Sequence, residues 1–108
     1  MNEVEISGIV SHIPVERELA NGNRTLSWRI KVPRDESGND SIPCTVNLEI
    51  TSKALANKIE SLEVSQTVHV SGVLRSRFWQ GAGGSSSRLE VEVISLKKIS
   101  KSQLIKTH

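Results

Sequence analysis

Arg75, Arg77 and Trp79 recur at every second residue of one segment, a spacing that places side chains on one side of a strand. Guanidinium groups pair with phosphates and stack on flat groups, and an indole ring offers a face for a nucleobase. Stacking of this kind contributes roughly 1–3 kcal/mol per base. Together these three side chains could read the phosphates and bases of a single strand. The other interpretation is that Trp79 packs under a loop or in a subunit contact.

Further cations could extend this surface. Arg29 and Lys31 also alternate along an expected strand, where contact with phosphates and simple solvation are both open. Arg17 could contact a nucleic acid or tie the first turn to the rest of the domain, and Arg88 could close over a bound strand. The full set of candidate DNA-binding residues is Arg17, Arg29, Lys31, Arg34, Arg75, Arg77, Trp79 and Arg88.

The composition argues against several other functions. The 108 residues suffice for one domain, and 14 basic against 12 acidic residues give a net charge of +2, too small to indicate a nucleic-acid binder alone. Cys44 is the single cysteine, and His12, His69 and His108 show no ligand spacing. We therefore expect no disulfide, metal, cofactor or catalytic site. An acidic, alternating N-terminus and short apolar runs predict a cytoplasmic protein without a membrane segment. DNA binding would make it nucleoid-associated.

Hydrophobic periodicity predicts the elements that position these residues. Apolar residues alternate with polar ones in five segments, which we expect to be strands: Val4–Val10, Leu26–Val32, Thr45–Ile50, Val68–Trp79 and Leu89–Val93. Helical spacing of apolar residues after the Thr51-Ser52 pair, a candidate N-cap, predicts a helix from about Lys53 to Ser61. Trp28 falls in register with the core positions of its strand and is expected in the core.

Turn signals separate these elements. Pro14 is expected to end the first strand and Pro33 the second, with a polar loop over residues 35–40. Residues 81–87 read as a flexible hairpin loop that could order on DNA, and they lack the features of a nucleotide-binding loop. Residues 97–108 read as a basic tail without secure structure.

Three strands, a helix and a two-stranded hairpin form the element order of an OB-fold, an all-β five-stranded barrel with one short helix. We expect residues 1–99 to form this domain and residues 100–108 to form a short basic C-terminal tail. Val70 and Leu74 are predicted to face the core opposite Arg75, with Phe78 partly buried near the barrel end. Cys44 is predicted to be small and partly buried.

Several stretches resemble the bacterial single-stranded-DNA-binding protein family. The strongest is residues 68–79, VHVSGVLRSRFW, which is similar to a family strand with two arginines before a Trp. Pro14–Arg17 followed by Gly22, the strand Trp28–Val32, and Val4–Val10 add weaker matches. The ordered set runs from Val4 to about Ile99 and is more specific than any of its parts.

The chain departs from that family in two places. The family carries aromatic stacking platforms on the third strand, where this chain has the outward residues Thr45, Asn47, Glu49 and Thr51. It also ends in an acidic tip that recruits partners, whereas this chain ends in KSQLIKTH. In both respects it resembles a short form of the family, similar to primosomal replication protein N, a dimeric OB-fold protein of replication restart.

The resemblance implies sequence-independent binding of single-stranded DNA in replication, recombination or repair, without catalysis and with RNA left open as a ligand. A homodimer or homotetramer is expected, with Val4–Val10 as its pairing edge and replication or repair proteins as further partners. Glu49, Glu90 and Glu92 are unfavourable for a DNA face and are assigned to the solvent side or an interface. The alternative is an OB-fold interaction module of a primosome assembly that binds DNA weakly or not at all.

Overall fold

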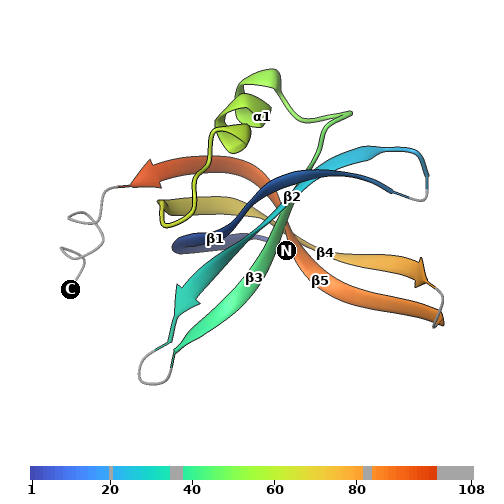
Figure 1. The fold of residues 1–108 in the computed structure, drawn as a ribbon, viewed down its shortest axis with the longest axis horizontal. Helices are drawn as coiled ribbons and strands as arrows, with labels where there is room; N and C mark the ends of the chain where they lie inside the picture. Colours follow the sequence, from blue (N-terminus) through green and yellow to red (C-terminus); the bar gives the residue numbers. More distant parts are fainter. Residues whose placement is uncertain (20, 35–37, 82–83, 100–108) are drawn as a thin grey trace.

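A computed structural model describes residues 1–19, 21–34, 38–81 and 84–99, leaving aside the side chains of residues 77–81 and 84–86. Its elements are the strands and the helix β1 (Val4–Glu18), β2 (Arg24–Pro33), β3 (Asn39–Asn47), α1 (Lys53–Glu60), β4 (Thr67–Gly81) and β5 (Gly84–Ile99). The strands form a closed barrel in the order β1-β2-β3-β5-β4 (Figure 1). This confirms the predicted five-stranded barrel with one short helix.

The barrel closes through one short parallel contact. The neighbouring strands β1–β2, β2–β3, β1–β4 and β4–β5 all pair antiparallel. Between β3 and β5 the pairing is parallel and covers two residue pairs, Cys44 with Val91 and Thr45 with Glu92. This contact places Thr45 of β3 beside the acidic positions of β5.

The first strand is longer than predicted. Pro14 does not end β1, which continues to Glu18 and pairs Val15 with Ser27 of β2. The pairing register shifts between Val10 and His12 and again between His12 and Val15. Proline cannot donate to a ladder and is tolerated where pairing is interrupted. Pro14 lies within the second irregular stretch, so the strand bends there and then resumes.

The third strand begins and ends earlier than predicted: β3 spans Asn39–Asn47, so Asn39 and Asp40 of the predicted polar loop are strand. β3 ends at Asn47, whose side-chain Oδ1 accepts a hydrogen bond from the Glu49 backbone N–H at 2.9 Å. The Asn47 carbonyl also accepts from the Thr51 backbone N–H at 2.9 Å. Asn side chains form such local turns in competition with a ladder. Ile50 therefore lies in a turn and is 75% exposed, contrary to its predicted place in the strand.

The last two strands are also longer than the sequence indicates. The antiparallel ladder of β4 and β5 continues to the pair Gly81–Gly84, so most of the predicted loop over residues 81–87 is strand. At its other end β5 runs to Ile99, which pairs with Thr67, so residues 97–99 are strand and not tail. Backbone pairing with a neighbouring strand extended both segments despite their low intrinsic propensity. Residues 100–108 lie outside the described part of the chain.

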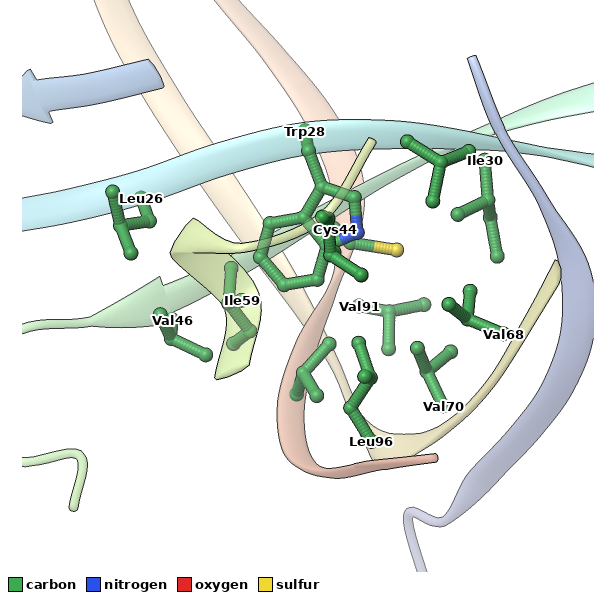
Figure 2. Packing of buried hydrophobic residues seen from close by; sticks show 13 residues of the cluster. Leu26, Trp28, Ile30, Cys44, Val46, Ile59, Val68, Val70, Val91 and Leu96 are labelled. Atoms are coloured by element: carbon green, nitrogen blue, oxygen red, sulfur yellow. The ribbon is translucent and has the colours of Figure 1, made fainter. Parts of the chain in front are cut away.

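The core lies inside the barrel and under α1. Its members are buried apolar side chains from every strand and the helix region (Figure 2): Val10, Leu26, Trp28, Ile30, Cys44, Val46, Ile59, Leu62, Val68, Val70, Val91, Val93 and Leu96. This confirms Trp28 and Val70 as core residues and shows Cys44 more completely buried than expected. The Ser52 hydroxyl caps α1 by accepting from the Leu55 backbone N–H at 3.1 Å.

Leu74 was wrongly predicted to be in the core. It faces the same side as Val70 but is 43% exposed, and Leu89 nearby on β5 is exposed too. Beyond this point β4 and β5 run together away from the barrel as a two-stranded arm (Figure 1). An apolar residue on the arm has no opposite barrel wall to pack against, so strand alternation alone overpredicts its burial.

Gly72 is required where β4 crosses the irregularity in its pairing with β5. A Cβ atom at this position would overlap the backbone carbonyl of Glu92. We predict that Gly72→Ala lowers the free energy of unfolding by about 1–3 kcal/mol, because backbone must shift to admit the methyl group. Ser95→Ala on the facing strand serves as the control. Equal stability of the two variants in urea unfolding would contradict the claim that the Glu92 carbonyl leaves no room for a side chain at position 72.

Cys44 provides a probe of the core. Burial raises the pKa of its thiol from 9.0 to about 12, with the Arg29 charge lowering it and the Glu90 charge raising it. Below pH 9 the folded and unfolded chains both keep the thiol proton. Above pH 9 the unfolded chain loses it first, so the free energy of unfolding falls as pH rises, by up to about 1.4 kcal/mol per pH unit.

We therefore predict that a thiol reagent at pH 8 modifies Cys44 only as fast as the protein unfolds. The decline in stability above pH 9 should be shallower in Cys44→Ala than in the unsubstituted protein. Rapid modification of the folded chain at pH 8 would contradict the burial of this thiol.

Candidate nucleic-acid interface

Several of the candidate cations lie on the outer face of the sheet, the face turned away from the core. On β2 the core residues alternate with outward positions that include Ser27, Arg29 and Lys31. Ser27 pairs directly with Thr45 of β3. The outward residues of β2 therefore form a row that runs from the hydroxyl of Ser27 to the cations of Arg29 and Lys31.

On β4 and β5, two of the predicted DNA-binding arginines, Arg75 and Arg88, are paired with carboxylates. Arg75 of β4 lies 2.8 Å from Glu92 of β5, measured from Nε to Oε2. Arg88 lies 3.2 Å from Glu90 on the same strand, measured from Nε to Oε1. A phosphate that binds Arg75 or Arg88 must therefore compete with a carboxylate that is already in place.

Glu90 and Glu92 do not lie on the solvent side, one of the two places expected for them. Cross-strand register pairs Val73 with Glu92 and Arg75 with Glu90, so both glutamates share the outer face with the arginine. Glu90 is 2% exposed, and the Glu92 side chain is largely covered. Charged groups this deeply buried require paired charges, which the arginines supply. Glu49 is exposed in the turn after β3 and pairs with Arg24 at 3.4 Å.

The remaining described candidates differ in their partners. The guanidinium of Arg29 donates to the Ser41 hydroxyl at 2.8 Å and to the Ser41 carbonyl at 3.3 Å. Arg34 pairs with Asp40 at 3.4 Å on the surface. Arg17 and Lys31 are exposed, and neither forms an ion pair with another residue in the described ranges. Arg17, Arg29 and Lys31 thus offer cationic groups without a competing carboxylate among these residues.

Arg77 and Trp79 are placed only by their backbone. Both belong to the outer arm of β4, where Arg77 pairs with Arg88 and Trp79 with Ser86. Their side chains lie outside the described part of the structure. The base-stacking role of Trp79 therefore stays a prediction.

A pocket of about 420 Å³ opens on the outer face where β1 bends past β2. It is lined by residues of β1, the turn after it, β2, β3 and β5: Val15, Arg17, Glu18, Leu19, Thr25, Ser27, Thr45 and Glu90. The Thr25 hydroxyl donates to the Arg17 carbonyl at 3.4 Å and links the β1 wall to the floor. Among the candidate residues whose side chains the structure describes, Arg17 lines this pocket. Sequence reasoning missed Thr45 and Glu90 because the parallel β3–β5 contact that unites them has no local signal.

The described ranges lack the features of two further kinds of site. No group of three or more His, Cys, Asp or Glu side chains there could hold a metal ion. No helix in those ranges is long and apolar enough to cross a membrane.

Comparison with known proteins identifies the family. A model of the single-strand binding protein family matches residues 1–99. The chain belongs to the single-strand binding protein family. Three solved structures share the fold, and no curated protein matches the sequence. The family match confirms the resemblance and, with the closed barrel, the predicted OB-fold.

The three solved structures overlap almost the whole chain. The N-terminal domain of PriB from Thermoanaerobacter tencongensis, described as dimeric, has a TM-score of 0.68 and 22% identity over 93% of this chain and 98% of that one. SSB of Plasmodium falciparum in complex with single-stranded DNA has a TM-score of 0.72 and 16% identity over 93% and 96%. The small single-stranded DNA-binding protein of Streptomyces coelicolor has a TM-score of 0.64 and 22% identity over 94% and 95%. At these identities the likeness concerns the fold.

Proposed function

We propose that this protein binds single-stranded DNA on the outer face of its barrel, independently of overall sequence and without catalysis. Membership of the single-strand binding protein family carries the proposal, and the Plasmodium falciparum relative is described in complex with single-stranded DNA. The outer face contributes the cations that such binding requires. The same membership supports a role in replication, recombination or repair, which we place in the cytoplasm.

The electrostatics suggest which cations bind first. Arg17, Arg29 and Lys31 present charge without a carboxylate partner among the described residues, whereas Arg75 and Arg88 are paired with Glu92 and Glu90. Phosphates would meet the unpaired cations of β1 and β2 before they engage the paired ones. Because few cations are free, each domain should bind weakly, and several linked domains would raise the avidity.

Base contacts complete the proposal. Trp79 on the β4 arm would stack on one base, close to the arginines at alternate positions of the same strand. The third strand offers no aromatic ring on its outer face, where Thr45 and Asn47 lie. Hydroxyl and amide groups at these positions can form hydrogen bonds with bases instead.

An open strand edge supports assembly into a homo-oligomer. Residues 4–8 of β1 pair with β4 on one side, while the pairing with β2 begins only at Ile9. Within the described residues, their other edge has no strand partner. A second copy could pair there about a two-fold axis, as proposed from the sequence. The PriB relative is described as dimeric. In the described part of the chain, nothing favours the interaction-module alternative over DNA binding.

Lys31→Gln tests the proposed function. We expect it to weaken binding of a fluorescein-labelled oligo-dT and to reduce the slope of log K against log salt by roughly 0.7, because one phosphate contact is lost. Lys53→Gln removes an exposed charge from α1 and should leave both quantities unchanged. Fluorescence anisotropy from low to moderate salt measures them. Equal effects of the two substitutions, or no binding by the unsubstituted protein, would contradict the proposal.

A further inference from the structure

The pocket on the outer face contains a buried hydroxyl that has no hydrogen-bond partner among the described residues. Thr45 is 2% exposed and lines the pocket. Its Oγ1 atom is buried and has no hydrogen-bond partner within the described ranges. Buried polar groups in folded proteins are nearly always paired, so an orphan at a pocket wall indicates a place where a ligand completes the bonding.

Charge is distributed unevenly in the same pocket. Arg17 and Glu18 are exposed at its rim, whereas the third charged residue of the lining, Glu90, is buried. Arg88 pairs with the buried Glu90 carboxylate, at 3.2 Å from Nε to Oε1. The interior therefore presents a carboxylate and a hydroxyl, and the Arg17 cation lies at the entrance beside the Glu18 carboxylate.

The walls are fixed by the ladder, so the pocket is part of the fold. Val15 pairs with Ser27 and Arg17 with Thr25, which holds the end of β1 beside the floor. Val15 is an exposed apolar residue of this wall and offers a surface against which a flat ring can lie. The volume of about 420 Å³ falls within the range of roughly 300–1,000 Å³ typical of small-molecule sites.

We infer that this pocket takes one unstacked nucleobase of the bound strand and prefers a base that carries an exocyclic amino group. An amino group would point its N–H bonds toward the Glu90 carboxylate, as carboxylates accept from the amino group of cytosine in known complexes. The Thr45 hydroxyl can donate or accept and would bond a neighbouring ring atom. Thymine presents a carbonyl oxygen in place of the amino group and would be repelled by the same charge.

The flanking phosphate would meet Arg17 at the rim. The row of Arg29 and Lys31 on β2 would receive the strand beyond the pocket. The inference rests on the proposed binding of single-stranded DNA and adds a preference among bases to it.

The test compares two homopolymers of equal length, oligo-dC and oligo-dT, whose bases are alike in size. At pH 7.5 we expect the full-length protein to bind oligo-dC at least about fivefold more tightly. Thr45→Val keeps the shape of the side chain and removes its hydroxyl, and it should weaken the binding of both oligomers, because the hydroxyl can bond a ring atom of either base. Thr67→Val is the matched control, because Thr67 is equally buried, its hydroxyl also lacks a partner in the described ranges, and it does not line the pocket.

Glu90→Gln provides a second variant, with folding checked by circular dichroism. It should bring the affinity ratio close to one, mainly by improving the binding of oligo-dT. Binding of both oligomers with a ratio near one, and with affinities unchanged in Thr45→Val, would overturn the inference and leave the proposed function in place. Failure to bind either oligomer at low salt would instead remove the proposed function, and the base pocket with it.

Discussion

The short parallel contact between β3 and β5 is the constraint on which both faces of the barrel depend. Only two residue pairs form it, yet it joins Cys44 to Val91 inside the barrel and Thr45 to Glu92 outside. On the inside it completes the enclosure of Trp28 and the buried thiol. On the outside it brings the hydroxyl of β3 beside the carboxylates of β5. The core and the proposed binding surface thus both depend on the contact between β3 and β5 that closes the barrel.

Much of this fold could be predicted because strand alternation is a local signal. The core positions of β2, including Trp28, and the helix after Ser52 follow from periodicity and capping. The errors occur where non-local pairing decides the outcome. A register shift carries β1 past Pro14, and the β4–β5 ladder converts a glycine- and serine-rich segment into strand. The intrinsic propensity of a segment carries no information about which strand will pair with it.

The candidate site was predicted less completely, for the same reason. The alternation that placed Arg75 opposite the core was correct, but its partner Glu92 lies on another strand and depends on register. Glu90 and Glu92, which by sequence alone are unfavourable for a DNA face, pair with Arg88 and Arg75 on this face. The net charge of +2 conceals this arrangement, because paired and unpaired cations count equally in a sum.

A nuclear magnetic resonance titration tests most directly the claim that the outer face of the barrel binds the single strand. A short oligo-dC would be added at low salt to the ¹⁵N-labelled protein while its backbone amide signals are followed. The account predicts the largest shifts on the outer positions of β2 and at Thr45 and Glu90, with little change in α1. Shifts confined to α1 and the turn before it, or no shifts at all, would contradict it.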